Sequence, residues 1–372
     1  MSRYYSWKSE ICLYDRHVAS NSSMADTLLR ELSNTDLDWM ITRGERSRLP
    51  SGQQLLSAQL NSDLLYVLIE GKLGLTIMEK PSAAEQSAAL IDELGQGEVV
   101  GVGALFDMPE TNSVNTLEPS MIMTLPISKM QAKLAEDIAF AAHFYRAIAI
   151  MLSGRLRRIF EQPGRIQHWG ERSAKEVLSI FGELRDSDID WLVSFGETQT
   201  VAADRVLLQA ARPVDALYVL LDGQMSISAP QEGNFNPLYL CFSGLENSTQ
   251  EQKAFATISK GGMPGIISFL DFRPLPVTIR ANRDSLVFAV PRQTLVTKLQ
   301  VDDSFASRFY RVIAIEILEL LQTVSARLTD SAAFNADDSE DLLDEELDMD
   351  DLQHMSEGAK KFNWMLSQLG VA

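Results

Sequence analysis

Between Gly97 and Val114 the chain reads GEVVGVGALFDMPETNSV, a loop in which three closely spaced glycines precede small and polar residues. Glycine-rich loops let backbone N–H groups approach an anion closely, and many phosphate sites use them. Such sites usually add a cationic side chain, yet this stretch has no Lys or Arg and carries Glu98 and Glu110 instead. The residue types therefore indicate the shape of an anion site without its charge.

Other patterns that could carry chemistry are missing from the sequence. It contains no GxxxxGK[ST] phosphate loop, no GxSxG elbow and no HExxH, and GQGEVVG follows an acidic run instead of a buried strand. The cysteines and histidines are scattered, at Cys12, Cys241, His17, His143, His168 and His354, which indicates neither a zinc site nor a disulfide framework. We therefore expect a non-enzymatic protein without a metal or other cofactor.

The elements that must position the glycine-rich loop occur twice in the chain. The segment LSNTDLDWM at Leu32 recurs as LRDSDIDWL at Leu184, an offset of 152 residues, and DLLYVLIEGKLGLTI recurs as DALYVLLDGQMSISA at the same offset. After an insertion in the second copy the offset becomes 164 at Gly101 and Gly265, and then 165 at FYRAIAI and FYRVIAI. Collinear identity on this scale indicates a duplication. Two copies are too few for a solenoid, so each copy should form its own domain.

Each copy predicts strands in its middle and helices at its ends. LLYVLIEGKLGLTI and ALYVLLDGQMSIS each predict two strands around a turn of an acidic residue and glycine, a pattern typical of a hairpin. Further strands are expected at MIMTLPI and LVFAVPR, and helical periodicity flanks both regions. The predicted order is helix, β-roll, helix, repeated once.

These features resemble the cyclic nucleotide-binding domain family. The resemblance rests on the LYVLxxG hairpins and on GIISFLDFRPLPVTI at Gly265, which looks like the family's phosphate-binding cassette, and the FYRxIAI helices are similar to those of a cyanobacterial branch. It implies an α+β, mainly β fold with two β-rolls of the double-stranded β-helix or jelly-roll type, each flanked by helices. The expected parts are an extension (1–27), two domains (28–162 and 179–328) joined by a linker (163–178), and an acidic tail (329–372) with a short C-terminal amphipathic helix.

The resemblance also implies how a cassette would bind its ligand: a short helix points backbone N–H groups at the cyclic phosphate, an Arg adds charge, and a Glu accepts from the ribose. In the first copy the glutamate position is Val102 and the arginine position falls at Glu110. A carboxylate about 4 Å from a phosphate would repel it by about 4 kcal/mol at an effective dielectric of 20. We expect no nucleotide at these positions, which are Gly101, Val102, Ala104, Leu105, Glu110 and Ser113.

The second cassette has lost the same contacts in a different way. Ile266 replaces the glutamate, and Leu275 stands where the arginine is usual, although Arg273 is close by. The corresponding positions are Gly265, Ile266, Ser268, Phe269, Arg273 and Thr278. We expect a degenerate site here too; the alternative is a second-messenger receptor that binds a cyclic nucleotide through this domain alone, with Arg273 on the phosphate.

Charge limits the partners and the location. The net charge is -18, and from Asp330 onward twelve acidic residues face two lysines. Negative charge repels the DNA backbone, and no helix-turn-helix follows the second copy, so we expect no DNA binding.

The longest apolar stretch is too short and too polar for a transmembrane segment, and the N-terminus lacks the features of a secretory signal, so we expect a cytoplasmic protein.

Two helical regions indicate protein contacts. The final helix of each copy carries an apolar stripe, which predicts either packing on its own roll or a homodimer through paired final helices; we favour the homodimer. In the tail, Phe362, Met365, Leu366 and Leu369 form one apolar face that could dock on the chain itself or on a partner, whereas a solvated tail is the alternative. The sequence thus predicts a regulatory or adaptor protein that acts on protein partners of unknown identity, or a structural component of a larger assembly.

Overall fold

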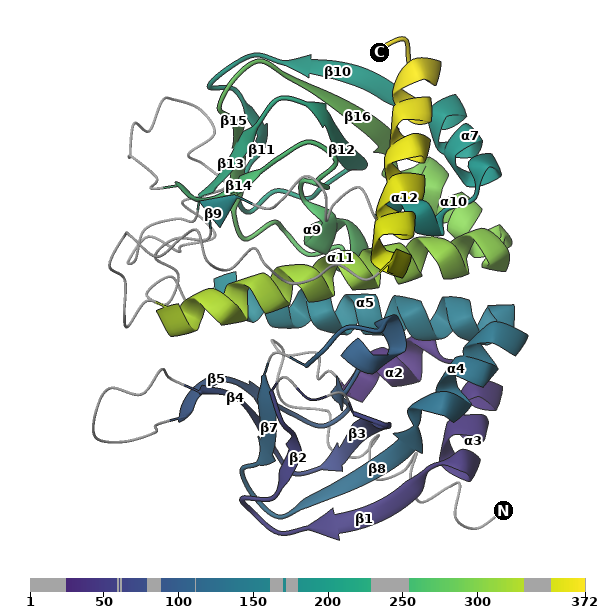
Figure 1. Cartoon of the computed structure of the whole chain (residues 1–372), viewed down its shortest axis with the longest axis vertical. Coiled ribbons are helices and arrows are strands. Elements are labelled where there is room, and N and C mark those ends of the chain that lie inside the picture. Colours follow the sequence, from purple (N-terminus) through teal and green to yellow (C-terminus); the bar gives the residue numbers. More distant parts are fainter. Residues whose placement is uncertain are drawn as a thin grey trace.

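The computed structural model describes residues 25–58, 60, 62–78, 88–110, 112–160, 170–171, 180–228, 254–330 and 349–371. Most of the predicted N-terminal extension and linker, the insertion in the second copy and the acidic stretch before residue 349 lie outside these ranges. Figure 1 shows the described elements as two β-rolls separated by a layer of two long helices.

The first roll follows the helices α2 (Ala25–Glu31) and α3 (Asn34–Arg43). Its strands are β1 (Glu45–Leu49), β2 (Gln54–Leu56), β3 (Leu64–Glu70), β4 (Leu73–Met78), β5 (Ala88–Leu94), β6 (Val99–Val100), β7 (Ser113–Thr116) and β8 (Ser120–Pro126). They form two four-stranded sheets, in the orders β1-β8-β3-β6 and β2-β7-β4-β5. The short helix η1 (Gly103–Phe106) lies between β6 and β7, where the sequence places the cassette.

The second roll follows η3 (Ile180–Glu183) and α7 (Asp186–Phe195). Its strands are β10 (Glu197–Val201), β11 (Val206–Leu208), β12 (Ala216–Asp222), β13 (Met225–Ser228), β14 (Ala254–Ile258), β15 (Thr278–Ala281) and β16 (Ser285–Pro291), and its cassette helix is α9 (Ile266–Asp271). The sheets are β10-β16-β12 and β11-β15-β13-β14-β9, in which β9 (Gly170–Glu171) comes from the predicted linker and runs parallel to β14. The predicted fold class, a mainly β fold of two rolls flanked by helices, is confirmed.

The predicted hairpins are wrong in their pairing, although both strands of each exist. β3 pairs with β6 and β8, whereas β4 pairs with β5 and β7 in the other sheet. Between them Gly71 has φ +101°, and a Cβ there would lie 2.4 Å from the Ser120 hydroxyl oxygen. Gly223 (φ +108°) has the same relation to Ser285. The glycine therefore turns a corner between the two sheets, which a local pattern of alternating residues cannot distinguish from a hairpin.

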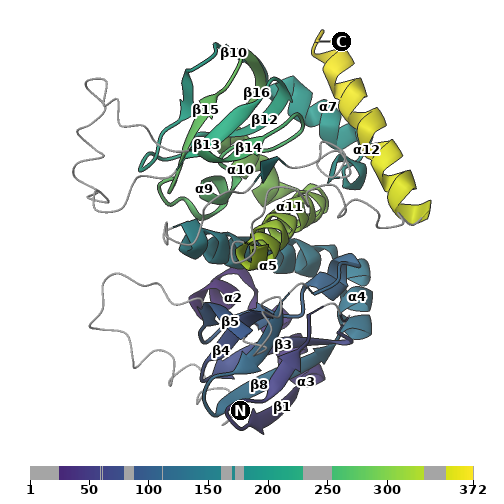
Figure 2. The same ribbon diagram turned by 60° about the vertical axis from the view of Figure 1, so that its left-hand side comes forward.

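Each roll ends in two helices, α4 (Ile127–Glu136) and α5 (Ile138–Phe160) in the first, and α10 (Arg292–Val301) and α11 (Asp303–Asp330) in the second. The helices α5 and α11 pack side by side between the rolls (Figures 1 and 2). Their apolar stripes, such as Ile148 and Ile313, are buried within one chain. A homodimer through these helices is therefore not needed to cover their apolar stripes.

None of the described helices is long and apolar enough to cross a membrane.

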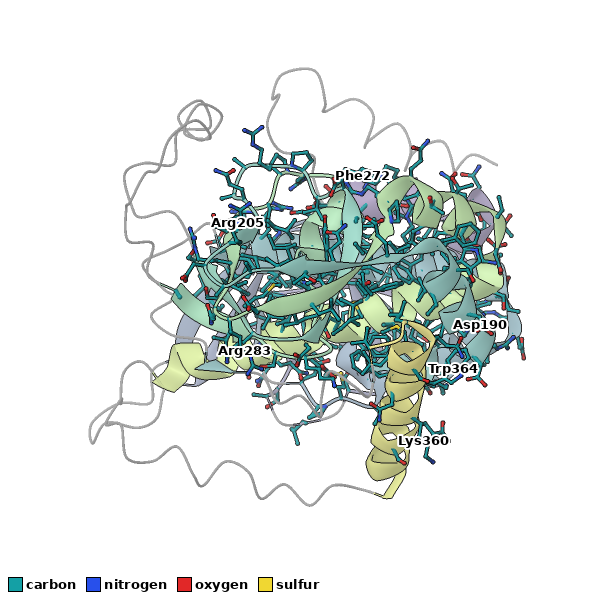
Figure 3. The ribbon with its side chains drawn as sticks, turned by 90° about the horizontal axis from the view of Figure 1, so that it is seen from above. Asp190, Arg205, Phe272, Arg283, Lys360 and Trp364 are labelled. Atoms are coloured by element: carbon teal, nitrogen blue, oxygen red, sulfur yellow. The ribbon has the colours of Figure 1, made fainter. Side chains whose placement is uncertain are left out.

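The tail contributes α12 (Met349–Gln368), which lies against η3 and α7 of the second roll. The predicted apolar face points inward: Phe362, Met365 and Leu366 are buried and Leu369 is half-buried. Lys361 Nζ donates to the carbonyl oxygens of Gly182 (2.8 Å) and Leu184 (2.6 Å). Figure 3 shows Lys360 and Trp364 one turn apart on one side of α12. Of the two destinations that the sequence leaves open, the structure places α12 on the chain's own second roll.

Candidate functional site

The two cassettes are contacted by the final helix of the opposite copy. Arg157 of α5 and Gln322 of α11 are equivalent at the offset of 165, as are Pro109 and Pro274. Arg157 Nη1 donates to the carbonyl oxygen of Pro274 at 2.6 Å, and Gln322 Nε2 donates to that of Pro109 at 3.0 Å. These matched contacts indicate that the copies are arranged around an approximate two-fold axis, with each final helix closing the site of the other roll.

The first cassette keeps the backbone shape that the sequence predicts. Gly101 has φ +85°, and a Cβ there would lie 2.7 Å from the carbonyl oxygen of Leu64, so only glycine fits. Val102 and Leu105 are buried in the core and Ala104 is half-buried. Their side chains therefore stabilise the roll by burying apolar surface.

Glu110 and Ser113 bind the backbone of their own roll. Glu110 Oε1 accepts a hydrogen bond from Gly103 N at 3.2 Å, and the Ser113 hydroxyl accepts one from Ala58 N at 3.1 Å. Burial raises the pKa of the Glu110 carboxyl, while the Gly103 N–H and the Arg155 charge act in the opposite direction. The loop thus places a carboxylate of its own on a cassette N–H group.

The pKa of Glu110 leads to a prediction for Glu110→Gln. Because the folded-state pKa is raised, protonation favours the folded chain below the ordinary value of 4.5, and this contribution is lost as pH rises through the raised value. At pH 7 glutamine keeps an acceptor for Gly103 without a buried charge, so we expect the free energy of unfolding to rise by on the order of 1 kcal/mol or less. Urea unfolding at pH 7 and pH 4 measures this difference, which should shrink at pH 4. A variant that is less stable at pH 7 would contradict it.

A pocket lies beside this cassette. Its charged lining consists of Asp92, Glu110 and Arg155, and the rest is mainly apolar. From the opposite copy, α11 contributes Leu318, Leu321 and Gln322 to the wall. A ligand in this pocket would meet two carboxylates and one guanidinium.

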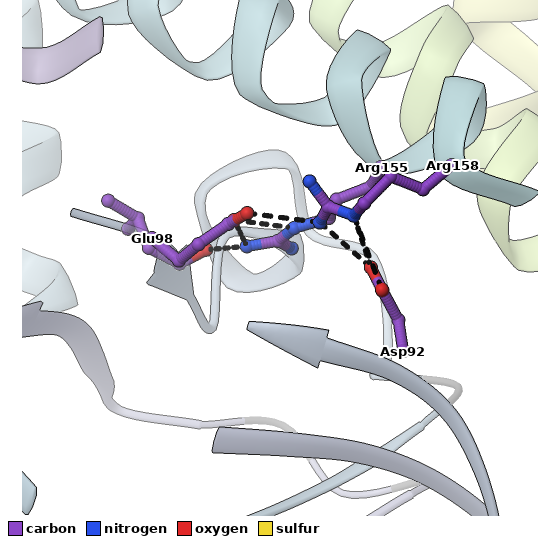
Figure 4. Close-up of polar contacts among 5 residues, drawn as sticks. Asp92, Glu98, Arg155 and Arg158 are labelled. Atoms are coloured by element: carbon purple, nitrogen blue, oxygen red, sulfur yellow. Dashed lines mark hydrogen bonds and ion pairs between the residues drawn. The ribbon is translucent and has the colours of Figure 1, made fainter. Parts of the chain in front are cut away.

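The guanidinium of Arg155 is held in a buried ion network, which Figure 4 shows in close-up. Arg155 Nη2 contacts Glu98 Oε2 at 2.6 Å and also donates to the carbonyl oxygen of Val99. Arg158 contacts Asp92 Oδ2 at 2.8 Å and Glu98 Oε1 at 3.0 Å, and the exposed fraction of Glu98 is 1%. The network ties α5 to the strands of its own roll. Neither arginine was predicted from the sequence, although their place in GRLRR, on the polar end of an apolar helix, is a signal for them.

The second cassette is also built for packing. Gly265 has φ +80° and precedes α9, whose Ile266 and Phe269 are buried. Thr278 Oγ1 accepts from Ala210 N at 3.3 Å. Arg273, the proposed phosphate ligand, is exposed and does not line the adjacent pocket.

A different cation occupies the second cassette. Arg157 crosses from α5 and donates to both carboxylate oxygens of Asp271, at 2.9 to 3.1 Å, and to the hydroxyl of the buried Ser268 at 3.2 Å. The exposed fraction of Arg157 is 5%. The cation at the second cassette thus comes from the other copy. No local sequence pattern predicts this contact, because the partners are 114 residues apart.

The pocket beside α9 has a mainly apolar wall. Residues of both copies line it, including Leu156, Phe160, Ile227, Ile266, Ile279 and Leu320. The polar side chains among its lining are Thr257, Ser259 and Glu316, and no Lys or Arg is among the described residues around it. The Thr257 hydroxyl is buried without a hydrogen-bond partner in the described structure.

Residues 46–137 match the family model of the cyclic nucleotide-binding domain. Among solved structures, the chain is similar to the regulatory domain of Toxoplasma gondii PKA with cAMP (13% identity, 84% of this chain, 98% of that chain, TM-score 0.26). It is also similar to the regulatory subunit of a cAMP-independent protein kinase A from Trypanosoma brucei (13%, 77% and 95%, TM-score 0.27) and to the c-di-GMP responsive regulator CLP of Xanthomonas campestris (18%, 36% and 64%, TM-score 0.32). Comparison with curated protein sequences finds no match. The expected cyanobacterial branch stays a prediction.

Proposed function

We propose that this chain, in which residues 46–137 match a cyclic nucleotide-binding domain, is a non-enzymatic regulatory or adaptor protein whose cassettes are closed by the chain's own side chains. The observation that carries the proposal is the hydrogen bond from Gly103 N to the Glu110 carboxylate. A cyclic phosphate needs such N–H groups and a nearby cation, and here a carboxylate already accepts the hydrogen bond. Such a protein would act by binding another protein.

In the first roll, two of the three charged residues that line the pocket, Asp92 and Glu110, are carboxylates and oppose a cyclic phosphate. Glu110 repels it, by about 4 kcal/mol for a separation of 4 Å at an effective dielectric of 20. Arg155 is the one cation in the described lining, and it is already paired with Glu98 at 2.6 Å. To serve a ligand it would have to give up Glu98, which would keep only its contact with Arg158, and losing one partner of a buried carboxylate is unfavourable.

In the second roll, Arg157 and Asp271 form a buried ion pair in the same way. A phosphate beside α9 would have to displace the Asp271 carboxylate from Arg157, a pair at 2.9 Å whose side chains are almost fully buried. The apolar pocket offers no other cation from its described lining. Burying an anion there without a counter-charge would be costly.

A second candidate function is a small-molecule receptor in the second roll. It is favoured by the pocket beside α9, whose described wall is mainly apolar and suits an apolar ligand. The unpaired Thr257 hydroxyl offers such a ligand one hydrogen bond. A cyclic nucleotide bound through Arg273 would instead require that exposed side chain to turn into the pocket.

Isothermal titration calorimetry of the full chain with cyclic AMP and cyclic GMP tests the proposal. We expect no saturable heat up to roughly 1 mM ligand, because among the described residues that line the two pockets the one cation, Arg155, is already paired with Glu98. Two micromolar sites per chain would contradict the proposal. One site that is lost in Arg273→Ala would favour the receptor alternative, and an unchanged Arg280→Ala control would show that the loss is local.

A further inference from the structure

Phe272, which follows the last residue of α9, is an exposed aromatic residue in a strained backbone conformation. Its φ is +59°, in the left-handed region, and the residue is 58% exposed. The equivalent residue of the first copy, at the offset of 165, is Asp107, whose φ is +57°. Aspartate adopts this conformation more readily than a bulky aromatic residue does. Neither the backbone nor burial therefore favours phenylalanine over aspartate at this position, and strain of this kind is common where a protein binds something.

Arg292 holds the Phe272 ring in place. Its guanidinium carbon lies 4.1 Å from the centre of the Phe272 ring and 5.0 Å from the centre of the buried Phe269 ring. Arg292 Nη2 also donates to the carbonyl oxygens of Ser268 (2.6 Å) and Phe269 near the end of α9. A ring that already rests on a guanidinium loses little conformational freedom when it binds a partner, which favours its use as a contact residue.

Two exposed arginines stand near the ring. Arg273 follows Phe272 in the chain, and the carbonyl oxygen of Arg212 accepts a hydrogen bond from Leu275 N at 3.0 Å, which brings Arg212 to the same segment. We call Arg212, Phe272, Arg273 and Arg292 the Phe272 patch. Aromatic and arginine side chains are the types that contribute most to protein interfaces.

The equivalent places of the two copies carry opposite charge. Arg212, Arg273 and Arg292 correspond to Leu60, Met108 and Ile127, Phe272 corresponds to Asp107, and the exposed Asp215 beside the patch corresponds to Asp63. These positions hold three positive charges and one negative charge in the second copy, but two negative charges in the first. The carboxylate of Asp271 is nearby as well, but it is buried and paired with Arg157. On a chain of net charge -18, the Phe272 patch is thus a local cationic surface that suits carboxylates.

We infer that the Phe272 patch binds an acidic segment of a partner protein. An apolar side chain of the segment would lie on the exposed face of the Phe272 ring, and carboxylates on either side of it would reach Arg212 and Arg273. The helix α12 leaves the patch accessible, because Figure 3 shows Phe272 on the side of the second roll away from Lys360 and Trp364. This inference rests on the proposed function, because it names the kind of partner through which an adaptor would act.

A single-stranded nucleic acid is a poorer occupant of the patch. It also combines flat rings with negative charge, but its phosphates continue along the strand and would meet the rest of a chain whose net charge is -18. A short acidic peptide needs only the local charge of the three arginines.

The test uses the full chain and a fluorescein-labelled peptide of sequence EEDFEDEE, followed by fluorescence anisotropy at low salt. We expect saturable binding with a dissociation constant of about 100 μM or below. Binding should be lost in about 1 M sodium chloride, which screens the contacts with the arginines. A peptide with alanine in place of the phenylalanine should bind at least about tenfold more weakly, because it lacks the ring that contacts Phe272.

Variants of the chain place the peptide on the patch. Phe272→Asp, which introduces the residue of the first copy, should weaken binding at least about tenfold, and Arg273→Glu should weaken it about fivefold. The matched control is Arg205→Glu, at an exposed arginine of the same roll that Figure 3 shows apart from Phe272, and it should bind like the unmodified chain. Aspartate relieves the strain at position 272, so this variant should fold, and the exposed Arg273 provides a second decisive variant.

Any of four results would overturn the inference. The first is no saturable binding up to roughly 1 mM chain. The second is equal binding by Phe272→Asp and the unmodified chain, or an equal loss for Arg205→Glu and Arg273→Glu, because the attraction would then be non-specific. The third is tighter binding of a labelled oligothymidylate that Phe272→Asp abolishes, which would make nucleic acid the occupant. The fourth is a dimer in light scattering that Phe272→Asp converts to a monomer, which would make it a second copy. Nucleotide calorimetry judges the proposed function separately.

Discussion

Replacing Arg157 with methionine is expected to lower the free energy of unfolding by about 3–5 kcal/mol, the usual loss when one partner of a buried ion pair is removed. Arg157 makes contacts with Asp271, Ser268 and the carbonyl oxygen of Pro274, and the Asp271 side chain is only 8% exposed. Methionine fills similar space but leaves that buried carboxylate without its hydrogen-bonded guanidinium partner. Urea denaturation followed by far-ultraviolet circular dichroism measures the change.

The internal duplication provides a matched control for this experiment. Gln322 is the equivalent residue and makes one neutral hydrogen bond, to Pro109 O, so Gln322→Met should cost only about 0.5–1.5 kcal/mol. The double variant Arg157→Met, Asp271→Leu should recover much of the loss, because it removes the unpaired charge. If Arg157→Met and Gln322→Met cost the same, the ion pair with Asp271 does not hold the second cassette to α5.

The second large effect is expected for Glu98→Gln, again about 3–5 kcal/mol of unfolding free energy. Glu98 is 1% exposed and accepts from both Arg155 and Arg158. Arg158 keeps Asp92 after the change, whereas Arg155 loses its charged partner inside the protein. Guanidinium chloride would screen the charges of this network, so urea is the denaturant of choice.

An exposed pair gives the matched control. Glu93 lies 3.5 Å from Lys72, and both side chains are 55% exposed, so Glu93→Gln should change the free energy of unfolding by about 0–1 kcal/mol. A loss for Glu98→Gln within 1 kcal/mol of this control would mean that Arg155 finds another partner or water. In that case the network would be dispensable for holding α5 on its own roll.

The sequence predicts the helices and strands of each copy well because local sequence patterns determine where these elements lie. Alternating residues, turn glycines and the repeated LYVLxxG segments all mark where strands begin and end, and the duplication makes each assignment twice. The pairing of β3 and β4 was wrong because strand partners depend on how the sheet closes. The pattern around Gly71 is compatible with a hairpin and with a corner, and its close approach to Ser120 decides between them.

The candidate site is only partly visible in the sequence. The sequence alone shows that a glutamate, Glu110, stands where the family has an arginine. The hydrogen bond from Gly103 N to the Glu110 carboxylate, however, depends on how the loop folds. The pair of Arg157 and Asp271 could not be predicted, because it joins residues of different copies through the packing of α5 on α11. The receptor alternative names Arg273 for its closeness in sequence, and the structure leaves this side chain exposed outside the pocket.

The packing of α5 on α11 within one polypeptide has a consequence for how the halves can diverge. Two separate chains would part on dilution and would carry every substitution on both sides of their axis. Here the chain connection fixes the effective concentration of one half around the other, so the packing of α5 on α11 persists at any dilution. It also lets matched positions take different residues, as Arg157 and Gln322 do, so that each face can acquire a separate task.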